Sequence, residues 1–191
     1  MKRRSTFYSL LVVVIAVLLM AIPFATHAPA QVANPNSPPL RNLVQAYDPV
    51  YMAGATAYSV FTTDTAASHQ VWYRVSGGDA LFRQRLRVYQ ENAGPRPQNQ
   101  LPPDSARRQE LISNEPTSWF MFPAETGILT YYFDGDHRVG ASQSWENAFG
   151  LKVRRTRYAN GNLYELGFED REDLDDFNDL EIQVVILQPL A

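Results

Sequence analysis

The last 30 residues of the chain carry an unusual concentration of carboxylic acids. Nine of them lie between Leu163 and Glu181, and Arg171 is the only basic residue among them. They are Glu165, Glu169, Asp170, Glu172, Asp173, Asp175, Asp176, Asp179 and Glu181. Like charges at this density repel one another unless a cation neutralises them. The segment contains no His and no Cys, so its hard oxygen donors suit calcium far better than zinc or copper.

The alternative is a solvated acidic loop that aids solubility and binds nothing. Such a loop would lack apolar anchors, whereas this segment interleaves its acids with Phe168, Leu174, Phe177 and Leu180. Phe177 in particular is expected to pin the loop to the core. The segment does not follow the spacing of an EF-hand loop. The pattern therefore favours a calcium site built on a turn between two strands.

The same segment resembles the C-terminal motif of the domain of unknown function 4114 family. The likeness lies in the triplet Phe168-Glu169-Asp170, the run from Asp175 to Leu180 and the β-branched strand that follows. It implies an exported β-sandwich of the kind found beside calcium-dependent adhesive modules, with calcium as its ion and no enzymatic reaction. The metal ligands it implies are Glu169, Asp170, Asp176, Asn178 and Asp179. Leu174 stands where the family has an acid, so Asp173 and Asp175 stay alternatives as a further ligand.

Three other groups of residues could do chemistry. Asp134-Gly135-Asp136-His137 could add ligands to the acidic turn, but an ordinary Asp-Gly turn is the favoured interpretation. Arg83, Arg85 and Arg87 form a positive stripe that could bind an anionic polysaccharide, although pairing with acids of a neighbouring strand is favoured. Glu165 and Glu169 share a strand face and could serve a glycoside hydrolase as acid and base. We expect no catalytic activity.

The elements that must position these residues are mostly β. Period-two alternation and β-branched or aromatic runs predict strands. They cover 57–62, 70–75, 82–88, 119–122, 128–133, 150–158, 162–168 and 180–187. Asn160-Gly161 predicts a tight hairpin, and Asn92–Pro103 reads as a loop. Asp104–Ile112 is the one helix candidate. The pattern predicts an all-β antiparallel sandwich or jelly roll, with a barrel as the alternative.

The N-terminus has the three regions of a secretory signal. Lys2, Arg3 and Arg4 precede an apolar run from Leu10 to Ile22, and Ala28-Pro29-Ala30 fits a cleavage site. We therefore expect a signal peptide over 1–30, a flexible Pro/Asn-rich linker over 31–46 and a β-sandwich domain over 47–191. An uncleaved membrane anchor is the alternative for the first segment. The signal predicts a secreted, extracellular or cell-surface protein, with the periplasm also open.

Net charge and cysteine content exclude several classes of partner and of functional site. Cleavage after Ala30 leaves 14 basic against 20 acidic residues, a net charge of −6, which argues against nucleic acid. The absence of cysteine excludes a disulfide scaffold and a thiol nucleophile. We expect a monomer that leaves the membrane and contacts a cell-surface or matrix polysaccharide or protein. A carbohydrate-binding module, with a planar strip of exposed Trp and Tyr, is the alternative function.

Overall fold

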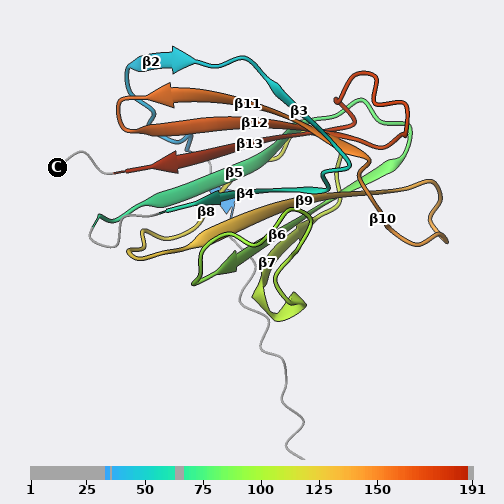
Figure 1. Cartoon of the computed structure of the whole chain (residues 1–191), viewed down its shortest axis with the longest axis horizontal. Coiled ribbons are helices and arrows are strands. Elements are labelled where there is room, and N and C mark those ends of the chain that lie inside the picture. The colour runs from blue at the N-terminus through green and yellow to red at the C-terminus, as the bar shows by residue number, and fades with distance from the viewer. Residues whose placement is uncertain (1–32, 35, 63–66, 189–191) are drawn as a thin grey trace, which may run out of the picture.

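The computed structural model describes residues 33, 34, 36–62 and 67–188, which form two packed antiparallel β-sheets (Figure 1). The prediction of an all-β antiparallel sandwich is confirmed. The predicted signal over 1–30 lies outside the described residues. Within the described ranges, no helix is long and apolar enough to cross a bilayer.

The larger sheet has eight strands, with β2 and β3 both pairing with β11 at one edge. From the other edge its strands are β1 (Ala33–Asn34), β8 (Trp119–Met121), β5 (Gln70–Gly77), β13 (Leu180–Leu187), β12 (Gly161–Glu169) and β11 (Gly150–Tyr158). Strands β2 (Leu43–Ala46) and β3 (Val50–Ala53) pair with different parts of β11. This order places the last two long strands, β12 and β13, in the middle of the sheet. The turn that joins them carries the acidic segment.

The smaller sheet has five strands, with β4 beside the first half of β9. Its strands are β10 (Glu146–Asn147), β9 (Thr130–Arg138), β6 (Arg83–Glu91), β7 (Arg107–Leu111) and β4 (Ala57–Phe61). Strands β6 and β9 form its longest ladder, from Arg83 opposite Arg138 to Glu91 opposite Thr130.

The core lies between the two sheets and follows from the alternation of the strands. Val71, Tyr73 and Val75 of β5 point inward, as do Leu86 and Val88 of β6, and all five are fully buried. Successive side chains of a strand face opposite sides of the sheet, so one face of each strand is buried while the other is free for polar groups. Each buried aliphatic side chain contributes about 1.5–3 kcal/mol relative to exposure.

The predicted hairpin between β11 and β12 is confirmed, with Ala159 and Asn160 as its two turn residues. Gly161 opens β12 for a steric reason, because a Cβ there would lie 2.1 Å from the carbonyl oxygen of Ile186 on β13. The Asn160 side chain accepts a hydrogen bond from the Arg41 backbone N–H and donates one to the Pro39 carbonyl, both at 2.8 Å. The turn thus fastens an N-terminal segment as well as two strands.

The prediction of a flexible linker over 31–46 is wrong for its described part. Residues 33, 34 and 36–46, here called the N-terminal strap, supply β1 at one edge of the larger sheet and β2 toward the other. Between them Leu40 packs on an outer apolar cluster formed by Trp72, Trp119, Val185 and Leu187. The strap lacks a strand-like pattern because its backbone partners, β8, β11 and Asn160, come from elsewhere in the chain.

The helix predicted over Asp104–Ile112 is also wrong. Only Asp104–Ala106 forms a single 3-10 turn, and Arg107–Leu111 becomes the edge strand β7 paired with β6. A helix over these residues would have had almost no apolar face to bury, whereas an edge strand tolerates charged side chains and gains ladder hydrogen bonds. The loop predicted over Asn92–Pro103 is confirmed.

Candidate metal centre

The acidic turn spans residues 170–179 between the end of β12 and the start of β13. Because Phe168 pairs with Leu180, the register brings the residues that follow Phe168 and precede Leu180 close to each other. Glu169, Asp170 and Asp179 therefore meet at one end of the sandwich. One carboxylate oxygen from each lies within 4.8 Å of the others.

These three carboxyls are shielded from water. The exposed fractions of Glu169, Asp170 and Asp179 are 1%, 3% and 9%. None of the ion pairs among the described residues includes any of them. Buried carboxylates without a basic partner are costly, so this arrangement is favourable only with protons or a cation bound.

Backbone amides and one side chain fix the orientation of the carboxyls. The Asp170 N–H donates to Asp179 Oδ2 at 2.7 Å, and the Phe177 N–H donates to Glu169 Oε2 at 3.1 Å. Gln84 Nε2, from β6 of the smaller sheet, donates to Asp170 Oδ2 at 2.7 Å. The cluster is therefore positioned by both sheets.

The turn is held down by Phe177, which is buried as predicted. Its ring meets Tyr51 edge-on at 5.3 Å between centroids, and its backbone adopts a left-handed conformation at φ 56°. A Cβ on Gly167 would lie 2.1 Å from the Phe177 carbonyl oxygen, so glycine is required there for the turn to fold back onto β12. This contact brings the Phe177 amide to Glu169.

Burial raises the pKa of all three carboxyls. For Glu169, a hydrogen bond with the Asp179 carboxyl raises the pKa further, and the Phe177 amide opposes it. For Asp170, burial outweighs the donation from Gln84, and for Asp179 it outweighs the donation from the Asp170 amide. Without a cation the cluster thus holds protons more tightly than free carboxyls do.

The structure brings together three of the five expected ligands: Glu169, Asp170 and Asp179. Asp176 is exposed, and its Oδ1 accepts a hydrogen bond from the Asn178 N–H at 3.2 Å. Asn178 Oδ1 is shielded from solvent and has no hydrogen-bond partner among the described residues. Asp173 and Asp175 both approach Glu169 in a second, more exposed group, so the structure keeps both as alternatives.

Gln84 is the residue of this site that sequence reasoning missed. It occupies an inward position of a strand whose other inward residues, Leu86 and Val88, are apolar. A polar side chain at a core position needs a hydrogen-bond partner. A glutamine at an inward position of an otherwise apolar strand face was therefore the signal in the sequence that could have indicated this residue.

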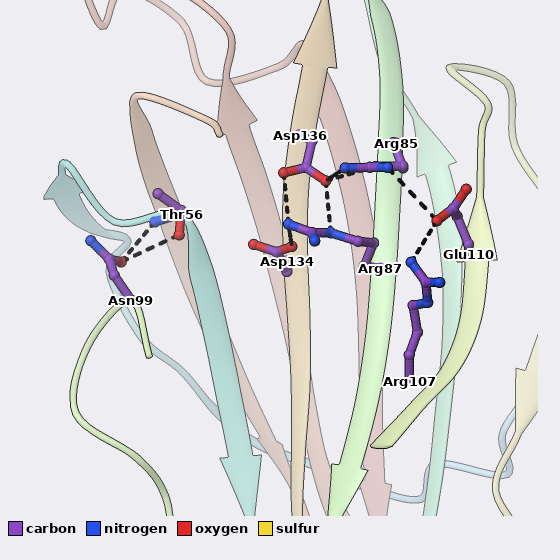
Figure 2. Close-up of polar contacts among 8 residues, drawn as sticks. All are labelled: Thr56, Arg85, Arg87, Asn99, Arg107, Glu110, Asp134 and Asp136. Atoms are coloured by element: carbon purple, nitrogen blue, oxygen red, sulfur yellow. Dashed lines mark hydrogen bonds and ion pairs between the residues drawn. The ribbon is translucent and has the colours of Figure 1, made fainter. Parts of the chain in front are cut away.

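Asp134, Gly135 and Asp136 do not form a turn, so that prediction is wrong. They lie in the middle of β9 beside Arg85 and Arg87 of β6 (Figure 2). Asp136 Oδ2 lies 2.7 Å from Arg85 Nη2 and 2.8 Å from Arg87 Nε, and Asp134 Oδ2 lies 2.6 Å from Arg87 Nη2. The favoured interpretation of the arginine stripe, cross-strand pairing with acids, is confirmed for Arg85 and Arg87.

Unlike the acids of the turn, this second acidic group therefore has basic partners. Asp134 is fully buried, and burial together with Asp136 raises its pKa to about 7 against the opposing effect of Arg87. His137, on the opposite face of β9, stacks on Phe82 and contacts the tilted ring of Phe149. None of these residues belongs to either group of metal-ligating side chains in the described part of the chain.

The remaining candidates occupy separate places. Glu165 lines a groove on the outer face of the larger sheet, whereas Glu169 is buried under the acidic turn, so the two do not line a common cleft. Trp72 and Trp119 are 5% and 8% exposed beneath Leu40 of the N-terminal strap. They do not form an exposed aromatic strip in this structure.

The chain matches no family model, and comparisons with curated proteins and with solved structures likewise find no match. The likeness of the acidic turn to the domain of unknown function 4114 family therefore rests on its own residues.

Proposed function

We propose that this protein is an exported, non-catalytic β-sandwich module of a structural or adhesive kind that binds calcium at the turn between β12 and β13. The observation that carries the proposal is the convergence of Glu169, Asp170 and Asp179 in a buried position, where they form no ion pair with any residue that the structure describes. A divalent cation would neutralise these carboxyls and fasten the turn to the end of the sandwich.

The donor set fits calcium. The cluster and its surroundings offer carboxylate oxygens and the unpartnered amide oxygen of Asn178, all of them hard ligands. No His belongs to either group of converging side chains among the described residues, which disfavours zinc and copper. Calcium accepts six to eight oxygens in flexible geometry, so it tolerates a site that mixes side chains, carbonyls and water.

The expected affinity follows from the setting. Extracellular calcium modules bind with Kd of about 10⁻⁴–10⁻³ M, a range in which millimolar calcium outside the cell fills the site. A ligand at ten times its Kd stabilises the folded state by about 1.4 kcal/mol. For a domain of this size such a gain raises Tm by about 3–6 °C.

The test is a melting curve of the EDTA-treated protein with and without about 10 mM calcium at constant ionic strength. Over the Kd range of about 10⁻⁴–10⁻³ M this concentration stabilises the protein by about 1.4–2.7 kcal/mol, so we expect Tm to rise by about 3–11 °C. Asp179→Asn keeps an oxygen for the Asp170 amide but removes a charge, and should abolish the rise. Glu172→Gln alters an exposed acid outside both ligand groups and should retain it. An unchanged Tm of the unmutated protein would contradict the proposal.

A further inference from the structure

The outer face of the larger sheet carries a groove of about 360 Å³ beside the acidic turn. Its floor is a row of side chains from four strands, β11, β12, β13 and β5. These four strands are neighbours in the larger sheet (Figure 1). In register, this row consists of Arg154, Glu165, Gln183 and Arg74. Gly167 and Lys152 extend the groove toward the acidic turn.

The charged side chains in the groove do not form ion pairs with one another. Arg154 and Glu165 are directly opposite on β11 and β12, yet neither side chain forms a hydrogen bond or an ion pair with a residue that the structure describes. Arg74 donates through Nε and Nη2 to the Gln183 amide oxygen at 2.9 and 2.8 Å rather than to an acid. This contrasts with Arg85 and Arg87 on the other sheet, which are fully paired.

The lining of the groove favours a ligand that carries both a negative charge and hydrogen-bond donors. Arg154, Arg74 and Lys152 favour a negative charge, while the carboxylates of Glu165 and Glu181 can accept hydrogen bonds from hydroxyl groups. A dense polyanion would be repelled by the two glutamates, and a neutral sugar would gain no ion pair from Arg154. A hexuronate ring satisfies both, because it carries one carboxylate and several hydroxyl groups.

We propose that this groove binds a carboxylated oligosaccharide, with Arg154 as the partner of the carboxylate and with Glu165 and Gln183 as partners of hydroxyl groups. Its volume lies at the lower end of the range of about 300–1,000 Å³ for ligand sites, so it takes a short segment of a chain. Lys152 Nζ donates to the Asp176 carbonyl oxygen of the acidic turn at 3.0 Å, but Arg154 and Glu165 form no hydrogen bond or ion pair with that turn, all of which the structure describes. The inference therefore does not depend on calcium there.

The test is a calorimetric titration of the purified protein with a tetramer of galacturonate, in EDTA so that calcium takes no part. We expect saturable binding that Arg154→Ser weakens about tenfold, the loss typical of one hydrogen bond to a charged group. Arg157→Ser is the matched control, because Arg157 is an exposed arginine of the same strand outside the groove. It should bind as the unmutated protein does.

Three results would overturn the inference. Equal affinity for a neutral galactose tetramer would remove the role of the carboxylate. Equal affinity for tetraglutamate would reduce the groove to an unspecific anion patch. Binding that appears only with calcium, is lost in Asp179→Asn and persists in Arg154→Ser would assign the saccharide to the acidic turn and support the calcium proposal instead.

Discussion

At the scale of the residue, burial and charge compensation separate the acids of this protein into two kinds. Asp136 is nearly fully buried but lies between two guanidinium groups. Glu169, Asp170 and Asp179 are similarly buried and face amides, a glutamine and one another. Only the second kind gains from a bound cation, which is why the acidic turn and not β9 is the candidate metal centre.

The raised pKa values of these three carboxyls predict the pH dependence of stability. A raised pKa in the folded state means that the folded protein binds protons more tightly than the unfolded chain. In EDTA the contribution to the free energy of unfolding is therefore fully present below the ordinary carboxyl pKa and is lost as pH rises through the raised value. Calcium needs the ionised carboxyls, so its stabilising effect should increase with pH over the same interval.

Urea unfolding at a series of pH values, with calcium and with EDTA, checks this dependence. The control is Asp179→Asn, since it leaves Asp134, whose pKa of about 7 acts in the same direction, unchanged. The variant should lose less stability than the unmutated protein as pH rises in EDTA. A calcium effect that is larger at about pH 4.5 than at about pH 7.5 would contradict the linkage.

At the scale of the element, β6 and β9 form a paired layer whose outer face is held by charge rather than by apolar packing. Arg85, Arg87, Asp134 and Asp136 alternate with inward residues such as Leu86 and Phe133. The alternation of β6 was readable in the sequence. The acids of β9 were not assigned to it, because they lie about 50 positions further along the chain and only the register reveals the pairing.

Asp136→Asn should destabilise the protein by about 3 kcal/mol, because removing one partner of a buried ion pair leaves the other charge uncompensated. Two arginines lose their shared carboxylate in this variant. Glu110→Gln is the control: its side chain is 34% exposed and 3.8 Å from Arg85 Nη1, and it should cost less than about 1 kcal/mol. The midpoint of urea unfolding measures both, and equal losses would refute the distinction.

At the scale of the whole molecule, the N-terminal strap covers part of the outer face of the larger sheet. It covers Trp72 and Trp119 through Leu40 and leaves the groove around Arg154 open. The sequence did not predict the strands of the strap, because the strap is rich in Pro and Asn and shows no alternation of apolar and polar residues. Strands β11, β12 and β13 and the β11–β12 hairpin were predicted correctly because alternation and turn residues are local signals. Strand β9 instead continues to Arg138 through residues that were expected to turn.

Asn160→Ala should release the strap, since it removes two hydrogen bonds from the hairpin turn to the strap backbone. We expect a loss of about 1–3 kcal/mol and faster amide hydrogen exchange over Leu43–Ala46, with β5 and β13 unchanged. Asn162→Ala, which removes only an exposed bond from Arg155, is the control. Uniformly faster exchange in all strands would mean that the strap is not a separate unit.

The acidic turn involves all three scales. The sequence predicts its carboxyls, its anchor Phe177 and its place between two strands, whereas the register of β12 with β13 comes from the structure. The sequence did not separate Asp176 from the converging acids, because which side chains point inward depends on the left-handed backbone at Leu174 and Phe177. Nor did it indicate Gln84, which reaches the turn from the other sheet.

Isothermal titration of the EDTA-treated protein with calcium tests the central claim most directly. We expect saturable binding of calcium with Kd of about 10⁻⁴–10⁻³ M. The measured heat should depend on the ionisation enthalpy of the buffer, because carboxyls of raised pKa release protons when the ion binds. Asp179→Asn should remove the signal, and Glu172→Gln should keep it. No saturable heat, or the same heat in Asp179→Asn, would contradict calcium binding at this turn.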